Sequence, residues 1–454
     1  MSPLNRPTSE PSRRDAAAID VGRTSVHPVV ACVLVSVVLG VLLAGQALQW
    51  TGQPSMTDQD TIARARALLG AIGSALQPGQ TGEPLGDMSL PARIVSANRV
   101  MVSEARRIDD ALDHESVVGR SLRPTAQLVL SGWLGAGNER AYCGRDGWLF
   151  YRADVEYLTG PGFLDSARMA RRAADSEEWA PPPHPDPRAA IGLFVRQLQE
   201  RAITLVVVPT PVKPAIHPEK LARTYEGTAA SVQNPSFAGA VEAFESLGAL
   251  VFDPTDALRA ARDRLGRPQY LATDTHWRPE SMELVAGQLA DFVMQHVSLP
   301  PRADPGYRVE PTAVTAFGDL RMMLNLPADS RVYPAETVRL RRVLDADGAP
   351  WKPSRAADVL VLGDSFSNIY ALASMGWGES AGFVEHLSLA LKRPVDRIVE
   401  NDNGAFATRA RLRHDLASGV DRLAGKRVVI YQFSARELAF GDWKVLGAEP
   451  GRGF

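Results

Sequence analysis

The sequence predicts an α/β fold, a three-layer α/β/α sandwich around a mostly parallel sheet. Strand and helix patterns alternate from about residue 188 onward with one interruption, which is typical of a parallel sheet covered on both faces. Residues 359–362, Val-Leu-Val-Leu, are typical of a strand buried on both faces at the centre of such a sheet. With 454 residues and 45% hydrophobic content, the chain can form one large or two medium domains with a substantial core.

Each element is predicted from its apolar spacing and from the Gly, Pro and polar residues that flank it. Residues 181–187 are Pro-rich and predict a loop, and the segment with Lys213 and His217 is predicted as another loop. Between residues 299 and 355 the alternation stops, so this Pro- and Arg-rich stretch is predicted as an insertion that can contain short strands, such as one at 337–343. The predicted helices are 188–200, 236–247, 254–265, 279–296, 368–375, 382–392 and 405–416, and the predicted strands are 203–208, 250–252, 359–362, 395–400 and 427–433.

A turn and a short aromatic strand are predicted upstream, at residues 144–150. The simplest interpretation is a hairpin that places Trp148 and Phe150 in the core.

The composition argues against a nucleic-acid-binding protein and against a disulfide-stabilised one. A charged fraction of 22% and a net charge of −2 are ordinary for a globular protein and give no indication of nucleic-acid binding. The two cysteines, Cys32 and Cys143, do not form a disulfide framework, which an exported protein of this size does not need.

The first 48 residues predict a membrane anchor. Residues 28–45 are eighteen uncharged residues, close to the length that spans a bilayer. Four arginines precede this segment and the next one is Arg64, so the positive-inside rule places the N-terminus in the cytoplasm. The alternative is a cleavable signal peptide with Gly45-Gln46-Ala47 as its cleavage site, and both interpretations export the remainder. The predicted organisation is a disordered cytoplasmic tail at 1–27, a transmembrane helix at 28–48, a helical stalk or collar at 49–130 and the main domain at 131–454.

The candidate catalytic residues are Ser365, His276 and Asp274. Ser365 follows Gly363-Asp364 directly after a predicted strand, at the end of the sheet where open α/β folds bind ligands. A serine hydroxyl needs a base to act as a nucleophile. In an extended segment, residues two apart project to the same side, so Asp274 can orient the imidazole of His276 toward Ser365.

Simpler interpretations exist for both motifs. Gly-Asp-Ser is common where a strand leads into a helix, because Asp and Ser cap helices. Asp-x-His alone can be half of a metal site or a polar turn, but no second cluster with ligand spacing completes a metal site. Nucleotide-phosphate loops and dinucleotide fingerprints are also absent from the sequence, so we expect no metal and no such cofactor.

Two further groups can help acyl transfer, which creates an oxyanion. The backbone N–H of Ser365 is one candidate donor, and a second can come from Asn403 or Gly404, in a loop that is alternatively an ordinary strand-to-helix turn.

Three side chains are weaker candidates for substrate binding. Arg436 can hold a carboxylate or pair with a helix glutamate. Trp277 can stack on a sugar or belong to the core, and Lys213 is the weakest of the three.

Asp-Thr-His-Trp at 274–277, followed by Gly-Asp-Ser-Phe-Ser at 363–367, resembles the alginate O-acetyltransferase family of the AlgX/AlgJ type, whose catalytic domain is SGNH-hydrolase-like. The resemblance covers about residues 130 to 445 and includes 144–150, 318–324 and 428–438. It implies that Ser365 is the nucleophile, His276 the base and Asp274 its partner. Ordinary SGNH esterases carry the serine first, so the order of residues sets this chain apart from them.

The sequence therefore predicts an O-acetyltransferase that acts on an exported polysaccharide through an acetyl-serine intermediate. The resemblance implies that a membrane-bound O-acyltransferase supplies the acetyl groups. The predicted anchor gives the expected location, the inner membrane with the N-terminus in the cytoplasm and the catalytic domain in the periplasm. One alternative is a carbohydrate or lipid esterase that uses the same residues. Another is a non-catalytic carbohydrate-binding scaffold subunit of an export complex.

The topology can be tested with protease and spheroplasts. If residues 28–48 anchor the chain, added protease should digest the exported domain and leave a protected fragment of only a few kilodaltons, detected by an N-terminal epitope tag. An intact main domain under these conditions would reverse the topology. A soluble periplasmic form that begins near Leu48 would instead favour the signal peptide.

Overall fold

The computed structural model describes residues 117–174, 182–225, 232–401 and 404–447. The chain divides into two units, residues 1–122 and 123–454, and of the first unit only residues 117–122 are described. The predicted tail at 1–27, the predicted membrane helix at 28–48 and most of the predicted stalk at 49–130 lie outside the described residues. Within the described ranges, no helix has the length and apolar character needed to cross a membrane.

The second unit contains a five-stranded sheet with the order β4-β3-β9-β7-β8, in which every neighbouring pair is parallel. All residues of the central strands β7 and β9 are buried, as a sheet covered on both faces requires. The fold class predicted from the sequence is thus confirmed for this sheet. The strands are β3 (Thr204–Thr210), β4 (Leu250–Val251), β7 (Val359–Gly363), β8 (Asp396–Val399) and β9 (Val428–Ser434).

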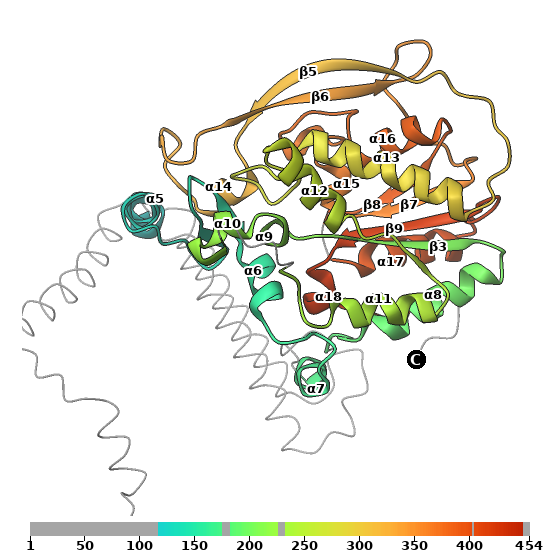
Figure 1. Cartoon of the computed structure of the whole chain (residues 1–454), viewed down its shortest axis with the longest axis horizontal. Helices are drawn as coiled ribbons and strands as arrows, with labels where there is room; N and C mark the ends of the chain where they lie inside the picture. Colours follow the sequence, from blue (N-terminus) through green and yellow to red (C-terminus); the bar gives the residue numbers. More distant parts are fainter. Residues whose placement is uncertain (1–116, 175–181, 226–231, 402–403, 448–454) are drawn as a thin grey trace, which may run out of the picture. The chain divides into compact units, whose positions relative to one another are not determined.

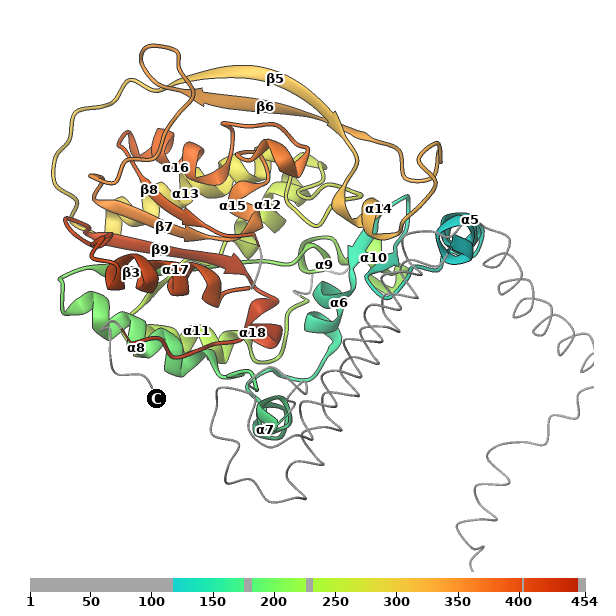
Figure 2. The same ribbon diagram turned by 180° about the vertical axis from the view of Figure 1, so that it is seen from behind.

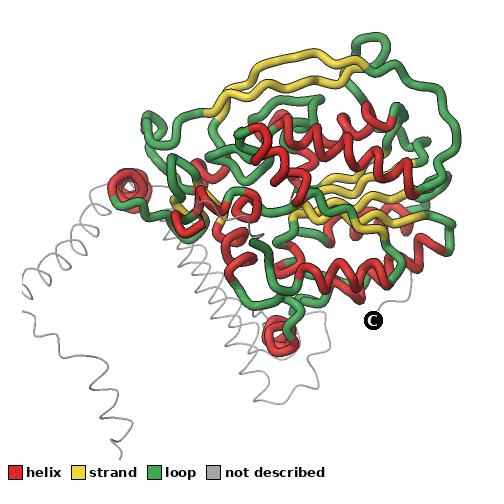
Figure 3. Tube along the Cα trace, in the orientation of Figure 1, coloured by secondary structure: helices red, strands yellow, loops and turns green. Residues whose placement is uncertain are grey.

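Helices cover both faces of the sheet, as Figures 1 and 2 show from opposite sides. Figure 3 shows the strands in yellow between two layers of red helices. Side chains of β7 alternate between two cores: Val359 and Val361 join one cluster, and Leu360 and Leu362 join the other. One face carries α12 (Thr255–Leu265), α13 (Pro279–His296) and α16 (Phe383–Leu391), and the other carries α8 (Pro187–Gln199), α11 (Phe237–Ser246), α17 (Phe406–Ala417) and α18 (Glu437–Phe440).

A small hairpin precedes the sheet and confirms the turn and aromatic strand predicted there. β1 (Ala141–Cys143) pairs antiparallel with β2 (Leu149–Tyr151), and the side chains of Trp148 and Phe150 are buried. Asp146 and Gly147 turn the chain with positive φ values of 53° and 77°. In chain order, helix α5 (Val117–Trp133) precedes the hairpin, and α6 (Arg152–Thr159) and α7 (Ser166–Ala174) follow it.

The stretch between residues 299 and 355 is more regular than the short strands predicted there. β5 (Arg308–Ala316) and β6 (Glu336–Leu344) pair antiparallel along nine residues each. This ribbon lies over the helical layer of α13 and α16, with Val338, Leu340 and Val343 of β6 buried in the core (Figure 1). β5 contains no buried residue, so its sequence lacks the apolar alternation by which a strand is recognised. The connection between the two strands contains α14 (Asp319–Met323).

Two local predictions were wrong. The segment predicted as a loop around Lys213 forms the short helices α9 (Lys213–Ile216) and α10 (Pro218–Leu221). The helix predicted at 368–375 is only the four-residue α15 (Ser365–Asn368), followed by the 3-10 turn η3 (Ala373–Met375). Buried Tyr370 accounts for the early end, because its hydroxyl donates to the carbonyl of Trp277 at 2.7 Å and its carbonyl accepts from Ala381 N at 3.0 Å. These tertiary contacts outweigh local helix propensity.

Gly363 gives a test of how tightly the strand-to-helix turn is packed. A Cβ at this position would lie 2.4 Å from Ser367 Oγ and 2.8 Å from Ser367 Cβ, so Gly363→Ala should force the turn apart. We expect a loss of roughly 1–3 kcal/mol in the free energy of unfolding, measured by urea denaturation.

A matched control is Gly239→Ala in α11, where an added Cβ would meet nothing within 4 Å. This helix substitution should stabilise by about 0.5–1 kcal/mol. Equal effects of the two substitutions would contradict the packing argument.

Candidate active site

A strand-to-helix turn presents Ser365 at the carboxyl end of β7. Ser365 is the first residue of α15, and Asp364 caps that helix by accepting from Phe366 N at 2.9 Å. The other carboxylate oxygen of Asp364 accepts from Ser434 N at 2.7 Å, which ties the turn to the end of β9. Ser365 itself is partly exposed, so its hydroxyl can be reached from solvent.

Gln432 of β9 fixes the same turn from beneath. Its buried amide accepts from Asp364 N at 3.1 Å and from Ser367 Oγ at 2.7 Å, and it donates to Asp364 Oδ1 at 2.8 Å. With both ends of the amide in use, the backbone around the serine has little freedom.

Asp274 and His276 lie in the loop between α12 and α13. The segment predicted as extended is a tight bend instead, closed by an antiparallel bridge between Tyr270 and Trp277. Asp274 Oδ1 accepts from both the backbone N–H of His276 at 3.0 Å and the ring Nδ1 at 2.7 Å. The predicted pairing of carboxylate and imidazole therefore forms through a local turn, because the bend brings the carboxylate back to its own chain.

The structure brings Ser365, His276 and Asp274 into one hydrogen-bonded line. His276 Nε2 is 2.8 Å from Ser365 Oγ, and the side chains of His276 and Asp274 are 5% and 2% exposed. The tautomer that satisfies both contacts donates from Nδ1 to Asp274 and accepts at Nε2 from the serine hydroxyl. This is the arrangement in which an imidazole removes the proton of an attacking serine.

The charges of this line favour a protonatable imidazole next to an ionised carboxylate. Burial alone would raise the pKa of Asp274, but the hydrogen bond and charge of His276, with the backbone N–H of Asp319, lower it to about 2. Burial alone would lower the pKa of His276, but the hydrogen bond and charge of Asp274, with the charges of Asp319 and Asp364, raise it above its ordinary value. The imidazolium form is therefore stabilised where acyl transfer needs it.

Several groups hold the bend from outside. Glu336 of β6 accepts from Ala272 N at 3.0 Å and from Thr273 N at 2.8 Å. The indole N–H of Trp377 donates to Asp274 Oδ2 at 2.9 Å. Lys213 of α9 is fully buried, and its ammonium donates to the carbonyls of Leu149, Ala272 and Asp274 at 2.5–3.0 Å.

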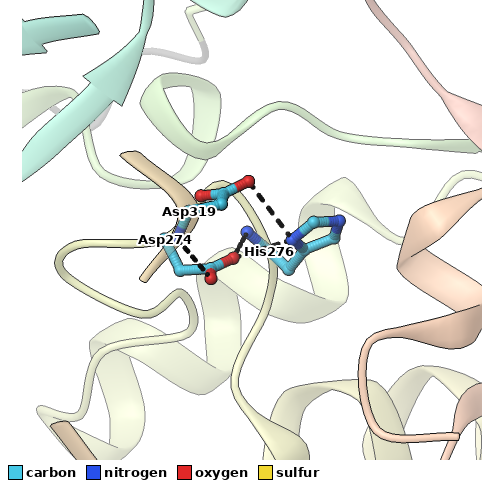
Figure 4. A group of neighbouring side chains, drawn as sticks. All are labelled: Asp274, His276 and Asp319. Carbon is cyan, nitrogen blue, oxygen red and sulfur yellow. Dashed lines mark hydrogen bonds and ion pairs between the residues drawn. The ribbon is translucent and has the colours of Figure 1, made fainter. Parts of the chain in front are cut away.

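Asp319, at the start of α14, is a site residue that the sequence analysis did not identify. Its backbone N–H donates to Asp274 Oδ2 at 3.0 Å, and its carboxylate lies 3.9 Å from His276 Nδ1 (Figure 4). The stretch 318–324 was part of the resemblance, but no pattern in it indicates which of its residues reaches the imidazole.

The ligand-type atoms of Asp274, His276 and Asp319 lie within 4.8 Å of one another. The 2.7 Å between Nδ1 and Asp274 Oδ1 is a hydrogen-bond distance. Two ligands at about 2.1 Å from a tetrahedral ion would be about 3.4 Å apart. The geometry of this cluster therefore fits a shared proton better than a metal ion.

Three of the predicted substrate-binding side chains have structural roles instead. Trp277 is fully buried and donates to the carbonyl of Phe366 at 3.2 Å, so its ring has no face to offer a sugar. Arg436 pairs at 2.9 Å with the fully buried Asp154 of α6. Lys213 is occupied by three carbonyls, and burial lowers its pKa to about 7.

The second oxyanion donor stays a prediction. Asn403 lies outside the described residues. Gly404 has a positive φ of 61°, and the next residue, Ala405, donates its N–H to the carboxylate of Glu437 in α18 at 3.0 Å. Asn401, just before the gap, accepts from Asn368 Nδ2 of α15 at 2.9 Å, which ties this loop to the helix that carries Ser365.

Comparisons with known proteins agree on one family. The family model described as SGNH hydrolase-like domain, acetyltransferase AlgX, matches residues 141–435. A probable alginate O-acetylase AlgJ of Pseudomonas fluorescens is 28% identical over 219 residues, which is 46% of this chain and 52% of that protein. The corresponding protein of Pseudomonas putida is 28% identical over 314 residues, 66% of this chain and 71% of that protein. The chain thus spans about half the length of the first relative.

Two solved structures are similar in part. The O-acetyltransferase domain of Pseudomonas putida AlgJ is 22% identical, with a TM-score of 0.49 over 67% of this chain and 93% of that one. AlgX of Pseudomonas aeruginosa is 15% identical, with a TM-score of 0.45 over 66% of this chain and 65% of that one.

The hydrogen-bonded line can be tested by removing one member at a time. Ser365→Ala, His276→Ala and Asp274→Ala should each lower turnover of an acetyl ester by roughly 10⁴-fold or more, and double substitutions should add little, because the three groups act as a unit. Ser246→Ala, at an exposed serine in α11, is the control and should leave turnover unchanged. Near-normal turnover by Ser365→Ala would rule out the serine as nucleophile.

Proposed function

The chain belongs to the AlgX family of SGNH hydrolase-like acetyltransferase domains, and from this premise we propose that it is an O-acetyltransferase for an exported polysaccharide. The observation that carries the proposal is the line from Ser365 Oγ through His276 to Asp274, with contacts of 2.8 and 2.7 Å at the carboxyl end of a parallel sheet. Alginate is the first polymer to test, because both relatives above are named as probable alginate O-acetylases.

In the first half-reaction, Ser365 Oγ attacks the carbonyl carbon of an acetyl donor while its proton passes to His276 Nε2. The tetrahedral intermediate then collapses, the bond to the donor's leaving oxygen breaks, and the imidazolium returns the proton to that oxygen. The product is acetyl-Ser365, and the ionised Asp274 stabilises the imidazolium throughout.

The oxyanion of the intermediate needs donors, each worth roughly 3–4 kcal/mol in subtilisin-type sites. Ser365 supplies one, because the N–H groups in the first turn of a helix have no acceptor within that helix. We place the second on Asn403 or Gly404, since the loop that contains them is joined to α15 through Asn401 and Asn368.

In the second half-reaction, a sugar hydroxyl attacks acetyl-Ser365. Its proton passes to His276 Nε2, the acyl–Oγ bond breaks, and the imidazolium returns the proton to Ser365 Oγ. Water can follow the same path, so a transferase must position the sugar hydroxyl, and positioning can contribute roughly 7–11 kcal/mol.

The acetyl donor and the location are part of the same proposal. Acetyl-CoA is cytoplasmic, whereas residues 28–48 are expected to anchor the chain in the inner membrane with the catalytic domain in the periplasm. A single apolar helix provides no path for acetyl groups. We therefore assign their delivery to a membrane-bound O-acyltransferase, and the anchor would raise the effective concentration of the two partners.

The decisive experiment incubates the protein with an acetyl ester and candidate oligosaccharides and resolves the products by mass. Acetylated oligosaccharide supports the transferase. Acetate alone favours an esterase. Absence of both products, together with no labelling of Ser365 by a serine-directed probe, favours a non-catalytic carbohydrate-binding scaffold.

Transfer should outcompete hydrolysis when the correct acceptor is present, because acceptor positioning acts on the acyl-enzyme that both reactions share. Rising acceptor concentration should increase acetylated product and decrease free acetate, measured in the same reaction. Acetate release at an unchanged rate with every acceptor tried would contradict the transferase. Normal polymer acetylation in cells that lack every membrane-bound O-acyltransferase would separately remove the partner.

A further inference from the structure

We propose that Asp319 is a positioning residue of the active site, a second carboxylate that orients the Asp274–His276 pair and stabilises the imidazolium of His276 through its charge. The inference rests on the proposed function only in assuming that His276 acts as the base.

Contacts from α14 show that its first turn is docked on the bend that carries the base. Asp319 N donates to Asp274 Oδ2 at 3.0 Å, and Asp319 Oδ1 accepts from Thr275 N at 2.7 Å. A Cβ on the preceding Gly318 would lie 2.1 Å from Thr273 O, so only glycine permits so close an approach. Together these contacts fix the carboxylate of Asp274 and the backbone on either side of it.

The second oxygen of Asp319 faces the ring. Asp319 Oδ2 lies 3.9 Å from His276 Nδ1, which is too far for a hydrogen bond but close enough for a charge interaction; the side chain of His276 is 5% exposed and that of Asp319 is 33% exposed (Figure 4). Figure 4 shows both carboxylates on the Nδ1 side of the imidazole. Nε2 is thus left to Ser365, and the positive charge that appears on the ring during the reaction is shared by two carboxylates.

Other charged groups among the described residues face this pair. One is the buried Asp154 of α6: burial raises its pKa, and the charge of His276 is among those that oppose the rise. Lys213 of α9 lies beneath the bend, with its ammonium 3.0 Å from Asp274 O, and Glu336 of β6 accepts from the backbone of the same bend. Asp364 raises the pKa of His276 from the serine side. Arg321 of α14 has its guanidinium 3.9 Å from the ring centroid of Phe317. None of these groups has an ion-pair contact with His276. Within the described part of the chain, the ion-pair contacts of His276 are with Asp274 and Asp319.

Burial, followed by the nearby charge of Asp274, raises the pKa of Asp319 to about 6. Asp319 is therefore ionised at neutral pH and becomes neutral as the pH falls through about 6, where it ceases to support the imidazolium. His276 must be neutral to accept the serine proton, so activity falls on the acid side as His276 becomes protonated. Any charge that raises the pKa of His276 moves this acid limb to higher pH.

The test is the pH profile of kcat/KM for hydrolysis of para-nitrophenyl acetate by the full chain. Asp319→Asn keeps an oxygen that can accept from Thr275 N and keeps the backbone N–H to Asp274, but it removes the charge. We expect the midpoint of the acid limb to move down by about one pH unit and the plateau value of kcat to fall by up to about tenfold.

Glu336→Gln is the matched control, because it removes a carboxylate that holds the same bend without an ion-pair contact to His276. It should change thermal stability or the level of activity and leave the midpoint of the acid limb in place. Asp319→Ala removes both the charge and the acceptor for Thr275 N, and it should show the shifted midpoint together with a larger loss of kcat.

Two results would overturn the inference. One is an acid limb of Asp319→Asn that coincides with that of the unmodified protein. The other is an equal shift in Glu336→Gln, which would make the bend and not the charge responsible. A failure of the proposed function looks different. An esterase would still hydrolyse the ester and show the shifted acid limb but would form no acetylated oligosaccharide, and a non-catalytic protein would neither hydrolyse the ester nor react at Ser365 with a serine-directed probe.

Discussion

The carboxylate of Asp274 is the interaction on which the rest of the site depends. Its Oδ1 accepts from the backbone and the ring of His276, and its Oδ2 accepts from Asp319 N and the indole of Trp377. One buried charge therefore joins three segments, of which the first and the last are 103 residues apart in sequence. An ionised carboxylate at 2% exposure is stable only when hydrogen bonds replace its water, and these four donors supply them.

Most of the α/β core could be predicted from the sequence because its signals are local. β7 is a run of apolar residues, and α13 was predicted with the bounds that the structure has. The Asp274–His276 pair could also be predicted, since the two residues are close in sequence. Ser365 lies 89 residues from His276, and its position directly after β7, at the carboxyl end of the sheet, could be predicted.

The rest of the site depends on contacts that no local pattern encodes. Asp319 and Glu336 come from the stretch that the sequence analysis treated as an insertion, where β5 lacks the alternation of a half-buried strand. Lys213 and Arg436 looked like groups for binding a substrate. Their roles follow from burial: Lys213 meets three carbonyls and Arg436 meets Asp154, partners that only the folded chain brings to them.

Exposure limits how donor and acceptor can reach this site. His276 and Asp274 are almost fully buried, and Asp319 closes the Nδ1 side of the ring, whereas Ser365 is partly exposed. On the proposed function, the donor must therefore approach Ser365, and the acceptor acetyl-Ser365, from the serine side. On the proposed function, the leaving oxygen of the donor receives a proton from His276 Nε2 and the attacking oxygen of the acceptor gives its proton to the same atom, so the two oxygens occupy one position in turn. On the proposed function, the donor must leave before the sugar binds, which is the physical basis of a ping-pong order at a single serine.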